Sequence, residues 1–177
     1  EVDGAEVPIE VGELVINHQW QRVDFQRSYE DPIVVANLLS ANDGDPATVR
    51  IDEVDPEGFS IRVQEWDYLD GAREEETVAY MVMESGRHQL PDGGWVEAGR
   101  LNTDATNTFV SVNFGVPFAE VPVVVTAVTS ADEGDAVTSR LRNISSKGFQ
   151  VGMKEQEANP QSHWEERIDY IAWEPSL

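Results

Sequence analysis

The feature that most constrains the fold is an internal duplication. When the sequence is shifted by 90 positions, residues 32–84 lie over residues 122–174 without a gap. A repeat of this length indicates two structural units of one kind, so a fold proposed for one half must also serve the other. The matched pairs include Pro32 with Pro122, Arg50 with Arg140, Gly58-Phe59 with Gly148-Phe149, Tyr80 with Tyr170, and Glu84 with Glu174.

Upstream of this block the duplication continues with small changes of offset. Residues 23 and 25 lie over residues 112 and 114 at a shift of 89, and residues 9–14 lie over residues 96–101 at a shift of 87. Changes of one or two residues between matching blocks are typical of surface turns. We therefore predict a first unit at residues 1–86, a Gly- and Pro-containing connector at 87–94 and a second unit at 95–177.

Within each unit the apolar residues recur with period two. Residues 59, 61 and 63 are apolar and alternate with polar neighbours, which is typical of a strand with one buried face. Residues 33–36 and 123–128 are almost continuously apolar and suit central strands that are covered on both faces. The pattern predicts an all-β fold made of two tandem six-stranded antiparallel β-sandwich repeats.

The predicted strands are separated by turn signals at residues 42–46, 55–58 and 145–148. Phe59 and Phe149 are predicted to anchor the two cores, and Gly58 and Gly148 to supply a positive φ just before them. The strands are expected to begin near Val11, Arg22, Ile33, Thr48, Phe59 and Thr77, and near Glu97, Thr108, Val123, Val137, Phe149 and Arg167.

The charge of the chain excludes several classes of partner. Its 34 acidic and 12 basic residues give a net charge of −22, which repels phosphate backbones and anionic lipid head groups. We therefore expect no nucleic-acid binding and no membrane insertion. The absence of cysteine excludes disulfides and thiolate metal sites. Residues 1–6 lack the features of a signal peptide, and we expect a piece of a larger secreted or cell-surface protein.

No catalytic motif stands out in the sequence. It contains no nucleophile elbow, no phosphate loop and no zinc-protease motif, and its three histidines are widely scattered. The doublets Glu75-Glu76 and Glu165-Glu166 repeat, but neighbouring residues of a strand point to opposite faces and cannot flank one glycosidic bond. We expect a non-catalytic protein without a cofactor. A hydrolase or lyase would need a cleft between the units lined by acids from both.

The order of these elements resembles the H-type lectins, which include the lectin domain of the discoidins. The resemblance rests on a Phe-containing strand, a Pro before a valine-rich strand, an Arg-containing strand, a Gly-Phe turn and a last strand that ends in Tyr170-Ile171-Ala172-Trp173. It implies six-stranded sandwiches that assemble as trimers and bind N-acetylgalactosamine or galactose at subunit contacts.

In that family a Trp-His pair after the Gly-Phe turn and an Arg near the start of the preceding strand contact the sugar. The resemblance places Trp66 at the Trp position, whereas Asp67 replaces the His and the Arg position falls near Pro46. In the second unit the Trp position is Gln156. These departures mean that the resemblance carries the fold over and does not carry the sugar specificity.

Two aromatic sites are candidates for carbohydrate binding. The ring of Trp66 could stack on a sugar while Asp67 accepts hydroxyl hydrogen bonds, or Trp66 could cover an edge of the core. His163-Trp164 follows the loop at residues 158–162 and could form a binding tip, or the indole could pack against the end of the sandwich.

Two kinds of charged residue are repeated at equivalent positions. Arg50 and Arg140 could form ion pairs with Glu65 and Glu155, or clamp the carboxylate of an acidic sugar. Asp45 and Asp135 are further candidates for carbohydrate binding, and the acidic turns that hold them could supply oxygen ligands to calcium, although they lack the EF-hand spacing and its closing glutamate. The alternative is a solvated turn held by Asx hydrogen bonds.

Together these features favour a carbohydrate-binding module on the cell surface or outside the cell, with a glycan or polysaccharide as its partner and possible homo-oligomers. The alternative is a structural or adhesive spacer without a sugar site. The two differ in the expected exposure of Trp66 and Trp164, because rings that bind a sugar must be accessible.

Overall fold

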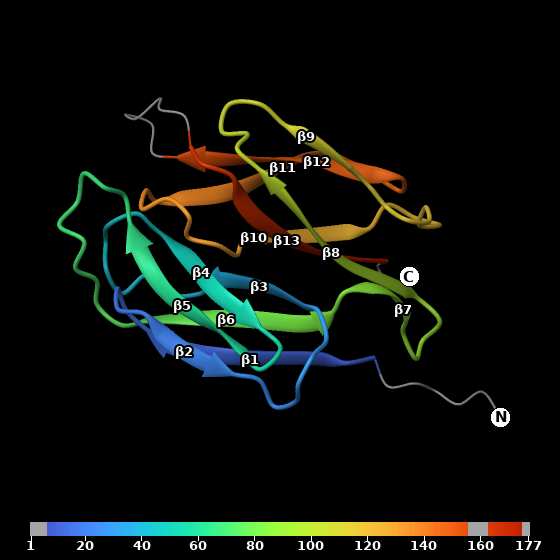
Figure 1. The fold of residues 1–177 in the computed structure, drawn as a ribbon, viewed down its shortest axis with the longest axis horizontal. Helices are drawn as coiled ribbons and strands as arrows, with labels where there is room; N and C mark the ends of the chain where they lie inside the picture. Colours follow the sequence, from blue (N-terminus) through green and yellow to red (C-terminus); the bar gives the residue numbers. More distant parts are fainter. Residues whose placement is uncertain (1–6, 156–162, 175–177) are drawn as a thin grey trace.

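The computed structural model describes residues 7–155 and 163–174, and it confirms the all-β prediction (Figure 1). No helix long and apolar enough to cross a membrane occurs among these residues. The first unit contains β1 (Ile9–Ile16), β2 (Gln21–Asp24), β3 (Pro32–Leu38), β4 (Ala47–Asp55), β5 (Gly58–Glu65) and β6 (Glu76–Glu84). The second contains β7 (Gly86–Gln89), β8 (Trp95–Thr103), β9 (Val110–Asn113), β10 (Val123–Val128), β11 (Val137–Ser145), β12 (Gly148–Glu155) and β13 (Glu166–Trp173).

The strands form two sandwiches of antiparallel sheets. In the first unit a sheet with the order β1-β6-β3 faces a sheet with the order β2-β5-β4. In the second unit the corresponding sheets have the orders β10-β13-β8-β7 and β11-β12-β9. Strand by strand, β8 to β13 repeat β1 to β6, as the duplication predicts.

The strand β7 is the one element of the described structure without a counterpart in the first unit. It pairs with β8 from Gly86 opposite Ala98 to Gln89 opposite Trp95. Residues 90–94 close the hairpin, with hydrogen bonds between Leu90 and the two glycines at 93 and 94. Residues 87–94, predicted to be a connector, therefore include part of a strand that belongs to a sheet of the second unit.

Each sandwich is built around the repeated phenylalanine. Phe59 packs against Tyr80 and Phe25, with ring centroids 5.4 and 5.7 Å apart. Phe149 packs against Tyr170 and Phe114 at 5.2 and 5.7 Å. Both phenylalanines are buried, which confirms them as core anchors.

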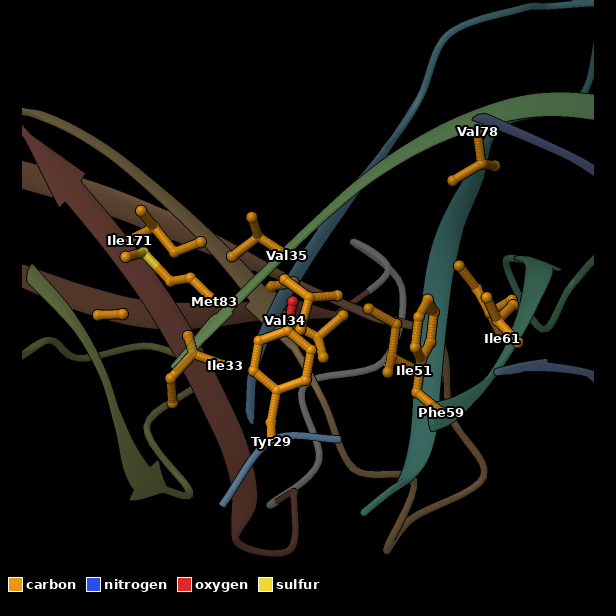
Figure 2. Packing of buried hydrophobic residues seen from close by; sticks show 14 of the residues in the cluster. Tyr29, Ile33, Val34, Val35, Ile51, Phe59, Ile61, Val78, Met83 and Ile171 are labelled. Carbon is orange, nitrogen blue, oxygen red and sulfur yellow. The ribbon is translucent and has the colours of Figure 1, made fainter. Parts of the chain in front are cut away.

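The first core continues into the second unit. Ile33, Val34 and Val35 of β3 are all buried, as their continuous apolar run predicts. Figure 2 shows Val35 beside Met83 of β6 and Ile171 of β13. Ile51, Phe59 and Ile61 lie on the other side of the cluster. Val96, Ala98 and Ala127 of the second unit join the same cluster. The two repeats therefore share a core.

The glycine before each phenylalanine is required by close approach of a neighbouring strand. A Cβ atom at Gly58 would lie 2.2 Å from the carbonyl oxygen of Val23, and one at Gly148 would lie 2.1 Å from that of Val112. The predicted positive φ is wrong for Gly58 and is confirmed for Gly148, whose φ is 156°. The lack of room for a side chain is common to both positions and explains why glycine is present in both copies.

We predict that Gly58→Ala lowers the free energy of unfolding by about 2 kcal/mol or more, because the methyl group must displace strand backbone. Gly44→Ala is the matched control, since nothing lies within 4 Å of a Cβ atom there. Urea unfolding of both variants tests this expectation. Equal free energies of unfolding for the two variants would contradict the prediction, because they would show that β2 can move away from β5 without loss of stability.

Candidate functional site

Each repeat wraps its acidic turn around one buried glutamate at the start of its last strand. Glu76 accepts hydrogen bonds from the Ser40 hydroxyl and from the backbone N–H groups of Asn42 and Asp43, both at 3.1 Å. Burial by itself raises the pKa of Glu76, but these hydrogen bonds and the charge of Arg73 outweigh it and lower the pKa to about 2. Glu76 therefore stays ionised and orders the turn.

Glu166 plays the same part in the second repeat. Its carboxylate accepts hydrogen bonds from the Ser130 hydroxyl and from the backbone N–H groups of Asp132 and Glu133, at 3.3 and 3.4 Å. Both glutamate side chains have 0 % exposure, so each needs a cation or several donors nearby. The second glutamate of each repeated doublet thus holds an acidic turn in place.

A buried guanidinium completes each turn, but the two come from different places. In the first repeat Arg73 donates to Glu76 at 2.8 Å and to the backbone carbonyl of Asp45 at 2.5 Å. The residue equivalent to Arg73 in the second repeat is His163. There Arg50 from the first repeat donates to Glu166 and to the carbonyl of Glu133, both at 3.1 Å. Arg50 therefore binds the two repeats together.

The predicted ion pairs of Arg50 with Glu65 and of Arg140 with Glu155 are wrong. In the β4–β5 register Arg50 lies opposite Arg62, while Glu65 lies opposite Ala47 and pairs with Arg73 at 3.6 Å. Arg140 lies opposite Gly152 and is exposed, and it donates to the Thr138 hydroxyl and to the Ser139 carbonyl. Equivalent positions in the sequence thus have different partners in the two repeats.

Carboxyl groups from both repeats meet beside Arg50. Asp67, just after β5, interacts with Asp135 of the second acidic turn, and burial followed by the charge of Asp135 raises its pKa. Burial also raises the pKa of Glu155, to which Asp135 and Glu133 contribute. The structure therefore brings Asp67, Asp135 and Arg50 into one junction, although the sequence places them in separate candidate sites.

His163 and Trp164 lie at the side of this junction. The imidazole is buried, with Nδ1 3.0 Å from the carbonyl oxygen of Trp164 and 3.5 Å from the carboxylate of Glu133. The Trp164 backbone N–H donates to the same carboxylate at 2.6 Å, while its indole is 68 % exposed. Gln156 and residues 158–162 of the predicted binding loop lie outside the described residues.

The first acidic turn already holds a positive charge. Carboxylate oxygens of Asp43, Asp45 and Glu65 lie within 4.8 Å of one another, the arrangement that a calcium ion would need. The Arg73 guanidinium is 4.0 Å from Asp43 and 3.6 Å from Glu65, so it offsets part of the negative charge of this cluster. Asp45 donates its backbone N–H to the Asp43 carboxylate, which is the Asx hydrogen bond of a solvated turn.

A groove of about 950 Å³ opens between the repeats. Residues of β1, β3, β6 and the start of β4 line one side, and residues of β10, β11 and the end of β13 line the other. Trp66 and Trp173 are its aromatic residues besides Tyr80, whose ring packs against Phe59 in the first core, and Glu13 and Arg140 are its charged residues among those described. Hydroxyl groups come from Thr48, Thr126, Thr138 and Ser139.

The groove contains two of the predicted site residues, Trp66 and Arg140, from different repeats. Sequence reasoning missed Trp173, which lines the same groove. Trp173 ends the last strand, and the duplication aligns it with Met83 of the first repeat. A tryptophan that replaces a methionine at an otherwise well-matched strand end was a usable signal. Asp45, His163 and Trp164 are not part of the groove lining.

Fold and site define the chain as a fused pair of β-sandwiches with an aromatic groove at their junction. The chain is similar to halomucin from Haloquadratum walsbyi, with 31 % identity over 166 residues, and the match covers 88 % of this chain. The chain spans 2 % of the length of halomucin. No protein-family model and no solved structure matches it.

We predict that Glu166→Gln lowers the free energy of unfolding by about 3 kcal/mol or more, because Arg50 is left buried without its counter-charge. The neighbouring Glu165→Gln is the control, since its side chain is exposed. Chemical unfolding of both variants gives the comparison. The double variant Arg50→Met/Glu166→Gln should lose less than the single one, and an equal or larger loss would contradict a dominant charge effect.

We predict that Asp135→Asn raises the melting temperature at pH 7 and that the gain shrinks towards pH 4. The raised pKa of Asp67 means that the folded state takes up this proton at a higher pH than the unfolded chain. Repulsion at the junction is therefore present at neutral pH and is relieved as the pH falls. Thermal melts between pH 4 and 8 test this expectation, with the exposed Asp132→Asn as the control. A gain in melting temperature that does not change with pH would refute repulsion at the junction as its cause.

Proposed function

We propose that the chain is a non-catalytic carbohydrate-binding module that holds a glycan in the groove between its repeats. The observation that carries this proposal is the lining of the groove, where Trp66 and Trp173 lie among residues with side-chain hydroxyls. Aromatic faces pack on the apolar faces of sugar rings, and a few placed polar groups fix their orientation.

Arg140 supplies the directional polar contact in this proposal. Its side chain is exposed at the groove, and its hydrogen bonds to the Thr138 hydroxyl and the Ser139 carbonyl engage one of its two terminal nitrogens. A guanidinium has five N–H donors, so the remaining donors can reach sugar hydroxyls or a sugar carboxylate. Across the groove Glu13 can accept hydroxyl hydrogen bonds.

The resemblance to H-type lectins supports the same location. It places Trp66 at the sugar-contacting Trp of that family, and Trp66 lines the groove. Those lectins bind their sugar where subunits meet, and here the groove lies where two repeats of one chain meet. The absence of the family's His and Arg at Asp67 and Pro46 argues for a different sugar.

The proposed setting is the cell surface or the extracellular space. Similarity to halomucin, a protein that is named as a mucin, supports it. The net charge of −22 also fits a module that must stay soluble within a long exposed polypeptide.

A spacer module without a sugar site is the second candidate. The shared core and the buried Arg50–Glu166 pair favour it, because they join the two sandwiches into one stiff unit whether or not the groove is occupied. In that case the groove would be a consequence of packing.

We predict that titration with neutral and acidic oligosaccharides produces a saturable change in tryptophan fluorescence. Trp66→Ala should weaken binding by about 10-fold or more, a loss of about 1.4 kcal/mol, because the stacking surface is removed. Trp164→Ala is the matched control, since its exposed ring lies outside the groove. A titration without any response would favour the spacer. Equal losses of affinity in both variants would show that the glycan does not bind in the groove.

A further inference from the structure

The β1-β6-β3 sheet has two edge strands, and the second repeat covers one of them. The buried carboxylate of Asp169 accepts the backbone N–H of Val34 at 2.9 Å. Arg100 donates to the backbone carbonyl of Pro32 at 2.8 Å and pairs with Asp31 at 2.8 Å. Side chains of the second repeat thus satisfy backbone groups along the edge of β3, where another strand could otherwise pair.

The other edge strand, β1, pairs only with β6 within the described part of the chain. The edge of its counterpart β8 is covered, because β7 pairs with β8 at four positions along that edge. The duplication places residues 9–11 of β1 where residues 96–98 of β8 meet β7. The first repeat therefore presents an edge that is equivalent to one already occupied in the second.

The edge of β1 also has the properties of a pairing template. Its eight residues run in unbroken register with β6, so no bulge turns the edge away. It contains neither lysine nor proline, and Ile9, Val11 and Val15 on its outer face are 37 %, 61 % and 59 % exposed. Soluble proteins normally protect a long, regular and apolar edge of this kind.

Charge complementarity indicates what the missing strand would carry. In the β7–β8 pair Arg87 donates to the carboxylate of Glu97 at 3.2 Å and lies opposite it in the register. The residue of β1 equivalent to Glu97 is Glu10, which accepts hydrogen bonds from Tyr80 and Gln26 just as Glu97 accepts them from Tyr170 and Gly115. An arginine in the same register would meet Glu10.

We propose that the outer edge of β1 docks an extended, arginine-bearing peptide segment as an added antiparallel strand. The segment takes the register of β7, and its arginine lies opposite Glu10. Backbone hydrogen bonds supply the affinity, and the arginine sets the register. The inference does not depend on a glycan in the groove.

The full chain and a synthetic peptide with the sequence of residues 84–91 test this proposal. We expect the peptide to shift the backbone amide resonances of β1 saturably and to leave those of β3 unchanged. Replacing the arginine of the peptide with glutamate should weaken binding by about 5-fold or more, because two carboxylates then face each other. The absence of a shift in β1, or equal binding of both peptides, would overturn the proposal.

Because the chain contains no cysteine, the register can be read by cross-linking. A Val11→Cys chain should form a disulfide with a peptide that carries cysteine in place of Gly86, since Gly86 lies opposite Ala98, the equivalent of Val11. We expect this reaction to be about 10-fold faster than with cysteine in place of His88, because pairing raises the effective concentration at one position. Equal rates, or preferential dimers of the Val11→Cys chain, would refute a β7-like occupant.

Discussion

The arrangement of the two repeats depends on the burial of the Arg50 guanidinium. A charge that is almost fully removed from water needs an opposite charge and further hydrogen-bond acceptors, and Glu166 supplies the first and the backbone carbonyl of Glu133 the second. The first repeat satisfies its own turn with Arg73, whereas the second has His163 at that position and takes its cation from the neighbouring sandwich. One residue difference between the copies thus makes the second turn depend on the first repeat.

The groove follows from the same arrangement. Where β3 meets β13 and β10, Val35, Ile171 and Ala127 form a continuous apolar contact. Farther from this contact the outer face of β1 is not covered, and Val11 remains 61 % exposed. The sheets therefore meet along one side and diverge along the other, which leaves the space that Trp66 and Trp173 line.

The sequence predicts the fold well because a duplication and a period of two report on local geometry. Both predict which residues of β5 and β12 face a core, and the repeated phenylalanines are where they should be. The partners of charged residues are a different matter, since alternation tells which face Arg50 occupies and not which repeat covers that face. The junction of Asp67 with Asp135 and the strand β7 were missed for the same reason. Where the first repeat has Arg73, the second has His163. This difference was a local sign that the cation beside the second acidic turn had to come from another part of the chain.

The depth at which Arg50 and Glu166 are buried determines how dissolved salt acts on this molecule. Mobile ions shorten the range of repulsion among surface carboxylates, and at about 1 M that range is about 3 Å. They do not enter the space around Glu166, whose side chain has 0 % exposure. Brine therefore weakens the forces that push the acidic surface apart and leaves the attraction that joins the two sandwiches unchanged. A polypeptide with a charge of −22 is in this way held together better as its surroundings become more concentrated.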